Sequence, residues 1–267
     1  MNLKTSARKS GLQPIESSWL RGFRPIYEKE LVRWFAKKRW ISHLVLWIGL
    51  SAVPTISLIT MGGTALSANQ GIGILSLFLW LGTTPMSIGT IVLSQGAIIE
   101  EKLTSTLLWI CSKPLSRPAF ILGKFAAYAV FIASIMLGTP ALIVYVTAGI
   151  FGLPSLVSLL NYLISVLMIY LLLLFLLAVT LMLGTFFNNI GIVTALALLV
   201  FIGGASLNTN QQLRQIEPVS FAALQRYAVE AVAGHIPSQA LIAMGVTFLL
   251  TVGCLALASW QMERHEF

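Results

Sequence analysis

The sequence predicts an all-α integral membrane protein, in which six transmembrane helices follow an amphipathic helix at the membrane interface. Of its 267 residues, 57% are hydrophobic and only 10% are charged, whereas soluble domains carry about 25% charged residues. No Lys, Arg, Asp or Glu occurs at 40–99 or at 125–213. A soluble chain would have to bury both stretches completely, so these observations favour a multi-pass membrane protein.

The N-terminal part divides into a polar segment, 1–24, and a candidate interfacial helix, 25–40. The first is predicted to be a mobile cytoplasmic tail. In the second, Pro25 suits a first helical turn, and apolar and basic residues at spacings of three and four take opposite faces. Such a helix lies in the membrane interface; it either only anchors the chain to anionic lipid or also contacts a partner. Its candidate residues are Tyr27, Glu30, Leu31, Arg33, Trp34 and Lys37.

The rest of the chain, 41–267, is predicted to form a single transmembrane domain. A spanning helix needs about 20 mostly apolar residues, and the fifth run is the shortest, so it either crosses at a tilt or is re-entrant. Pro54, Pro85 and Pro140 lie inside runs and are expected to kink them, which membrane helices tolerate. The six runs are 41–61, 73–94, 124–148, 159–183, 189–206 and 239–260.

The distribution of basic residues predicts the orientation. With six spans, one side carries 15 of the 17 Lys and Arg residues, which is the bias of cytoplasmic segments. Both termini and the loop 95–123 are therefore predicted to be cytoplasmic, in a plasma (inner) membrane, and no nucleic-acid partner is expected. The loop 207–238 is extracytoplasmic, either re-entrant or a cap; a helix is expected from Pro218 to about Ala233, with Arg226 and Glu230 able to pair.

Residues that could support chemistry inside the membrane are scarce. No run carries an ionisable residue at its centre, with Lys124 placed at a helix start, which argues against a proton-coupled carrier. The three histidines and the two distant cysteines, Cys111 and Cys254, form neither a metal constellation nor a disulfide framework. With no catalytic motif and no nucleotide-binding loop, the chain is not expected to be an enzyme or to bind a cofactor itself.

The most informative stretch is the charged island within the loop 95–123. A short helix is expected within it, because Thr104 or Ser105 can cap its start and Ser112, Lys113 and Pro114 stop it. Leu107, Leu108 and Trp109 are bulky residues that a plain connection does not need. This helix therefore either lies on the bilayer or inserts into a groove of another protein.

The island resembles the permeases of the type-2 ABC exporter family. Glu100 and Glu101 match the acidic end of the second span in that family, and 103–111 matches its short helix. A turn resembling Lys-Pro-x-Ser-Arg and a Gly-Lys at the next span follow, although Ser105 stands where glycine is common. The matching residues of the turn and span entry are Lys113, Pro114, Ser116, Arg117, Gly123 and Lys124. The short turn at 183–189 is also similar.

The resemblance implies the permease subunit of an ATP-driven exporter. Its partners would be an ABC ATPase subunit, which would hold ATP and Mg, a second permease subunit of the same or a related chain, and membrane lipid. The short helix would sit in a groove of the ATPase, with Glu100, Glu101 and Arg117 positioning it. The implied coupling residues are Glu100, Glu101, Leu103, Thr104, Thr106, Leu107, Leu108, Trp109, Lys113, Pro114 and Arg117.

Two alternatives remain at this stage. One is a membrane scaffold that recruits a soluble partner without transport, and the other is a secondary carrier. For the exporter, Glu101→Lys or Leu108→Asp is expected to uncouple ATP hydrolysis from transport without preventing membrane insertion. Because the spans are uncharged, an apolar or amphiphilic substrate is expected.

Overall fold

Helices make up the fold throughout the residues that the computed structural model describes: 20–36, 38–63, 67–103, 116–151, 157–209 and 217–264. No strand occurs within these ranges. Five helices are long and apolar enough to cross a membrane, by length and composition. They are Arg39–Gly62, Asn69–Leu103, Arg117–Ile150, Leu159–Phe186 and Ser238–Arg264. The chain is therefore compatible with a multi-pass membrane protein, as predicted.

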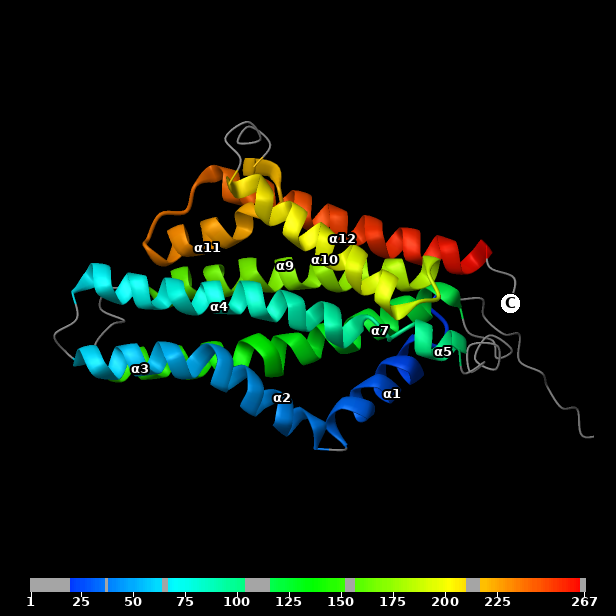
Figure 1. Ribbon diagram of the computed structural model, residues 1–267, viewed down its shortest axis with the longest axis horizontal. Helices are drawn as coiled ribbons and strands as arrows, with labels where there is room; N and C mark the ends of the chain where they lie inside the picture. The colour runs from blue at the N-terminus through cyan, green and yellow to red at the C-terminus, as the bar shows by residue number, and fades with distance from the viewer. Residues whose placement is uncertain are drawn as a thin grey trace, which may run out of the picture.

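The remaining predicted span corresponds to α10, whose apolar part at Ile190–Ser206 is shorter than the other five. The elements run in the order α1 to α12 along the chain, and Figure 1 shows the long helices side by side. Their bounds are α1 Phe23–Phe35, α2 Arg39–Trp47, α3 Val53–Gly62, α4 Ala68–Ser94, α5 Ile99–Leu103, α7 Arg117–Phe131, α8 Thr139–Ile150, α9 Leu159–Phe186, α10 Ile190–Thr209, α11 Ala223–Val232 and α12 Ser238–Arg264.

Two of the three prolines inside the predicted runs follow wider, π-helical turns. The stretch Ile48–Ala52 precedes Pro54, and Ile132–Gly138 precedes Pro140. Proline breaks the regular hydrogen-bond ladder, and a π turn accommodates such a break within a continuous helix. Gly138 is needed in the second turn, because a Cβ there would lie 2.1 Å from the Ala133 carbonyl oxygen. Helix α4 stays helical across Pro85.

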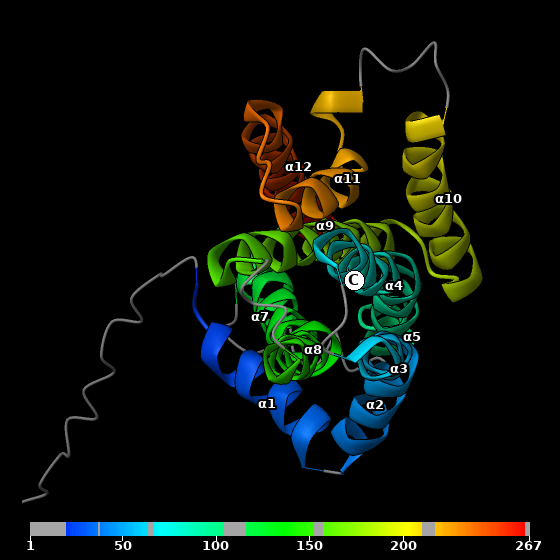
Figure 2. The ribbon, with the colours of Figure 1, turned by 90° about the vertical axis from the view of Figure 1, so that its left-hand side faces the viewer.

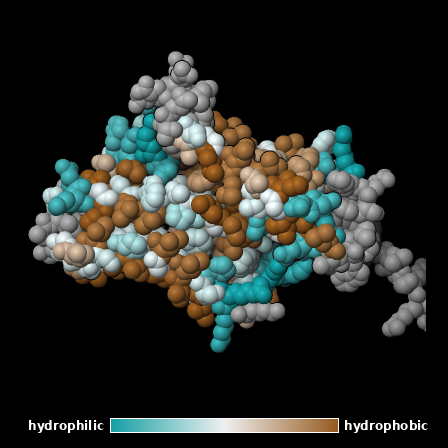
Figure 3. Space-filling view, viewed as in Figure 1, coloured by the Kyte–Doolittle hydropathy of each residue, from teal (hydrophilic) through white to brown (hydrophobic). Residues whose placement is uncertain are grey.

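Helix α9 lies at the centre of the bundle. It packs against α4, α7, α10, α11 and α12, and Figure 2 shows α9 between the α11–α12 pair and the α7–α8 helix. Its sequence is apolar on all sides, as expected of a helix surrounded by other helices. In Figure 3, hydrophobic residues cover the middle of the visible face, and hydrophilic residues gather over α1 and α11.

The segment before α12 is more than a surface cap. A 3-10 turn at Glu217–Val219 precedes α11, which lies alongside α4 and α9 (Figure 1) and buries Leu224 and Tyr227. Arg226 and Glu230 pair at 3.4 Å, as the sequence predicted. Helix α11 is shorter than the predicted span from Pro218, because residues 217–222 form the 3-10 turn and a bend.

Two predicted boundaries are wrong at the opposite end of the bundle, the end that carries α1, α5 and the end of α12 (Figure 1). The helix that was predicted to be interfacial covers Phe23–Phe35 rather than 25–40, because Lys38 adopts a left-handed φ of 55° and Arg39 begins the next helix. The third span begins at Arg117 rather than at 124. Pro118 in its first turn is the local signal for that start.

Candidate functional site

The centre of the site is Lys124, a fully buried cation inside α7. It follows the helix start at Arg117 by seven residues, about two turns, so its predicted place at a helix start is wrong. Its Nζ donates to Glu30 Oε1 at 2.7 Å and to Glu101 Oε1 at 2.9 Å. Glu30 is also fully buried, and Glu101 is 8% exposed. One ammonium group thus joins α1, α5 and α7.

Three further charged side chains complete the cluster. Lys29 Nζ donates to Glu101 Oε1 at 3.2 Å, and Arg33 Nη2 donates to Glu100 Oε2 at 3.0 Å. Burial lowers the pKa of Arg33, but the hydrogen bond to Glu100 and nearby negative groups raise it by more, so the net shift is upward. The three cations and three carboxylates balance in charge, and those that are buried, Lys124, Glu30 and Glu101, are paired, as the burial of charged groups requires. We call these six residues, Lys29, Glu30, Arg33, Glu100, Glu101 and Lys124, the charge cluster.

Helix α1 docks on α7 through a row of residues spaced by four. Ile26, Glu30 and Trp34 are its buried residues, and this spacing places them on one face. Ile26 packs over Gly123, Glu30 binds Lys124, and Trp34 stacks on Phe131 with ring centroids 4.3 Å apart. Tyr27 and Leu31, which were predicted on the apolar face with Trp34, are only partly buried. The buried face is therefore rotated relative to the predicted apolar face, and it includes Glu30.

The described residues on both sides of the segment 104–115 are bound to the ends of other helices. On one flank, Lys102 Nζ donates to the Thr185 carbonyl at 2.7 Å and to Asn188 Oδ1 at 3.3 Å, at the end of α9. Helix ends leave carbonyl groups unpaired, and a cation there is favourable. Lys102 therefore ties α5 to the turn between α9 and α10, which covers 187–189 because α9 continues as a helix to Phe186, further than the predicted turn at 183–189 allows.

The other flank is tied to α12 and to the start of α1. Arg117 Nη1 donates to the Met262 carbonyl at 2.8 Å and also to the Glu263 carbonyl, at the end of α12. The backbone N–H of Ser116 donates to the Arg21 carbonyl at 3.0 Å. The segment 104–115 is thus bordered by contacts with α9, α12 and α1.

The predicted coupling residues divide between those that the structure describes and those that it does not. Glu100, Glu101 and Arg117 take part in the contacts above, and Leu103 ends α5 with an exposed side chain. The remaining coupling residues lie outside the described ranges: Thr104, Thr106, Leu107, Leu108, Trp109, Lys113 and Pro114. Lys37, which was predicted for the interfacial helix, also lies outside them.

The sequence prediction omitted Lys29, Lys102, Ser116 and Lys124 from the candidate site. The signal for Lys124 was available, since apolar residues flank it on both sides within a helix that Pro118 starts. Contacts of Lys29 and Lys102 cross 72 and 83 residues of sequence, and no local pattern encodes them. Among the described residues, no group of three or more His, Cys, Asp or Glu side chains could hold a metal ion.

No protein-family model matches the chain, and no functionally curated protein is significantly similar to it. The arrangement of the site is therefore interpreted from its own contacts. It contains a neutral set of ion pairs with a buried centre, Lys124, Glu30 and Glu101, and a partly exposed border. Its geometry links the positions of α1, α5 and α7 to one another.

Gly123→Val is expected to lower the free energy of unfolding by about 1–3 kcal/mol, the usual cost of overpacking. A Cβ at Gly123 would lie 3.0 Å from Ile26 Cγ2 and 3.3 Å from the Phe23 carbonyl oxygen, and valine adds two methyl groups beyond it. Hydrogen exchange of α1 and thermal unfolding in detergent measure the effect. Gly245→Val is the control, since no atom lies within 4 Å of a Cβ there. Equal stability of both variants would contradict the close approach of α1 to α7.

Proposed function

We propose that the chain is the permease subunit of an ATP-driven ABC exporter, with the loop around 104–115 as the docking segment for a separate ATPase. The observation that carries the proposal is the joint made by Lys124 between α1, α5 and α7. A docking segment can drive a membrane domain only if its displacement reaches the spanning helices. The contacts at its flanks supply such connections.

The contacts suggest how a movement of the docking segment would pass to the spanning helices. Displacement of the segment 104–115 pulls on Glu101 and Lys102 on one side and on Ser116 and Arg117 on the other. Through them it reaches the end of α9, the end of α12 and the whole buried face of α1. The resemblance of the island to type-2 ABC exporter permeases supports the same assignment, with ATP and Mg held by the ATPase and a second permease completing the assembly.

We further propose six membrane spans with both termini in the cytoplasm. We assign α10 as the sixth span, since the apolar part at Ile190–Ser206 has 17 residues, at the lower limit for crossing the hydrocarbon core. The end with α1 and the end of α12 then faces the cytoplasm of a plasma (inner) membrane. Gly204 lies in the second half of α10, and its missing Cβ leaves room for the Phe221 ring to pack against this helix.

A mostly apolar cavity of about 140 Å³ supports an apolar or amphiphilic substrate. It lies between α4, α9, α10 and the start of α11, and Phe201, Ile202 and Leu172 provide apolar walls. Thr83 and Thr84 add hydroxyl groups on one side. Apolar walls with a few polar groups are typical of small-molecule sites.

The test is purification of the full chain, mildly solubilised from its native membrane, with its partners identified by mass spectrometry. An ATPase with a nucleotide-binding loop is expected in a ratio of about one to one. Leu108→Asp should remove it, because a charge replaces an apolar residue of the docking segment. Glu230→Gln, which breaks an exposed pair on α11, is the control and should retain the ATPase.

Two outcomes would contradict the exporter. Recovery of a non-ATPase soluble partner, with no transport by proteoliposomes, would favour the membrane scaffold. Transport that persists without ATP and follows an ion gradient would favour a secondary carrier.

A further inference from the structure

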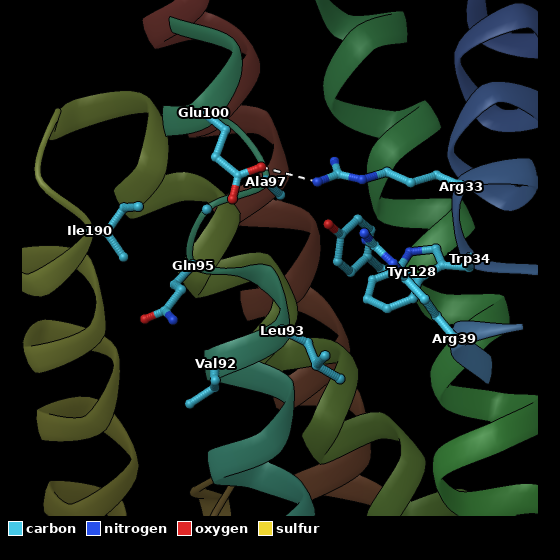
Figure 4. A pocket seen from close by; sticks show the side chains of 11 residues that line it. Arg33, Trp34, Arg39, Val92, Leu93, Gln95, Ala97, Glu100, Tyr128 and Ile190 are labelled. Carbon is cyan, nitrogen blue, oxygen red and sulfur yellow. Dashed lines mark hydrogen bonds and ion pairs between the residues drawn. The ribbon is translucent and has the colours of Figure 1, made fainter. Parts of the chain in front are cut away.

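A polar cavity of about 130 Å³ lies beside the charge cluster, at the end of the bundle that carries α1. It is bounded by the junction of α1 and α2 on one side and by α4, α5 and the start of α10 on the other (Figure 4). Six of its lining residues carry hydrogen-bonding side chains: Arg33, Trp34, Arg39, Gln95, Glu100 and Tyr128. The cavity is not used by the transmission of displacement proposed above.

The wall of the cavity contains a buried hydrogen-bond donor that lacks an acceptor. Trp34 is 8% exposed, and its Nε1 has no hydrogen-bond partner among the described residues. Its ring is fixed by stacking on Phe131 and by an edge contact with Tyr128, at centroid distances of 4.3 and 5.4 Å. Buried indole N–H groups usually have a partner. A ligand for this cavity should therefore present an acceptor oxygen to Trp34.

The charge of the cavity favours an anion. Glu100 Oε2 accepts from Arg33 Nη2 at 3.0 Å, so these two opposite charges cancel. Arg39 has no ion pair among the described residues, and Figure 4 shows its side chain reaching toward Trp34 and Tyr128. One positive charge thus remains over the cavity. A guanidinium group with a neighbouring N–H donor suits the oxygens of a phosphate.

The apolar side of the cavity indicates an amphiphile rather than a free anion. Val92 and Leu93 of α4 line it, and Val92 is 49% exposed. Ile88, one turn along the same face of α4, is 42% exposed. An exposed apolar track therefore leads from the cavity toward the middle of a candidate span. Arg39 is the first residue of another candidate span, which places the cavity where lipid headgroups meet acyl chains.

We propose that this cavity is a discrete site for an anionic phospholipid. Arg39 and the Trp34 N–H hold the phosphate, and an acyl chain lies along Val92 and Ile88. Such a site differs from general attraction of a basic helix to a charged surface, because it needs one neutral donor as well as one cation. It does not depend on the transport proposal, since it requires only that the chain spans a membrane.

Native mass spectrometry of the full chain in detergent, titrated with phosphatidylglycerol or phosphatidylcholine, tests the site. Wild type is expected to bind one phosphatidylglycerol about tenfold more tightly than phosphatidylcholine. Arg39→Gln and Trp34→Phe should each weaken phosphatidylglycerol binding about tenfold, the usual effect of losing one hydrogen bond to a charged group. Phenylalanine keeps an aromatic ring against Phe131 and removes the donor together with part of the buried volume. Thermal unfolding in detergent shows whether the variant stays folded, and a folded Trp34→Phe decides the question if Arg39→Gln fails to fold.

The control is Arg24→Gln, which removes the same charge from an exposed position of α1 where Arg24 pairs with Glu28. It should bind phosphatidylglycerol as wild type does. Equal affinity for both lipids, or equal losses in Arg24→Gln and Arg39→Gln, would overturn the discrete site. Competition by glycerol 3-phosphate at concentrations similar to those of the lipid would overturn the lipid assignment and leave a site for soluble phosphates.

Discussion

Lys124→Met is expected to lower the free energy of unfolding by about 3–5 kcal/mol, the cost of leaving buried charges without their partner. Lys124 is the only hydrogen-bond donor to Glu30 Oε1 among the described contacts, and it shares Glu101 Oε1 with Lys29. The second oxygens of Glu30 and Glu101 are buried and already lack hydrogen bonds within the described residues. Methionine has a similar length, so the loss comes from charge rather than from volume.

Thermal unfolding in detergent measures the loss, and hydrogen exchange locates it. We expect α1 to lose protection first, because Glu30 is the centre of its buried row. Lys29→Met is the control: its side chain is 55% exposed, and exposed ion pairs contribute about 0–1 kcal/mol. Combining Lys124→Met with Glu30→Gln and Glu101→Gln should recover much of the stability, since a neutral set tolerates burial. A mild effect of Lys124→Met alone would show that the cluster does not hold α1.

The helical class and most helix positions were predictable from the sequence because long apolar runs determine both. Five of the six predicted runs coincide with helices long enough to span a membrane, and the kinks expected at Pro54 and Pro140 take the form of π turns. These features depend on local composition, which periodicity and length capture directly. The boundaries at Arg117 and Lys38 depend on capping and backbone conformation, which hydropathy does not encode.

The candidate site was only partly predictable, since its contacts cross long sequence distances. Glu100, Glu101 and Arg117 were identified, and Glu30 and Arg33 were named in another segment, but the contacts between the two segments were not predicted. Glu30 and Lys124 are 94 residues apart. Each is a charged residue close to an apolar run, which is what the sequence near a membrane surface usually contains. Only the packing of α1 on α7 buries them together. Tertiary contact, rather than the amphipathic pattern of α1, decided which of its faces is inside.

Glu101→Lys is expected to lower the free energy of unfolding far more than Glu100→Lys, although the two positions are adjacent. In Glu101→Lys, a third ammonium group would face Lys124 and Lys29 in a site that is mostly closed to water. We expect the free energy of unfolding to fall by at least about 3–5 kcal/mol, as for a broken buried pair. We also expect α1 to detach from α7. Glu100 and Arg33 are 53% and 42% exposed, so Glu100→Lys should cost about 0–1 kcal/mol.

This difference changes which variant tests coupling to an ATPase. Glu101→Lys would impair transport simply by destabilising the docking of α1, so uncoupling in that variant carries no information about the ATPase. Glu100→Lys retains the buried joint and alters only its exposed border. Thermal unfolding and hydrogen exchange of both variants, measured before any transport assay, establish the distinction. Similar stability of the two proteins would mean that Glu101 is not buried against Lys124, and the proposed transmission through the charge cluster would fail with it.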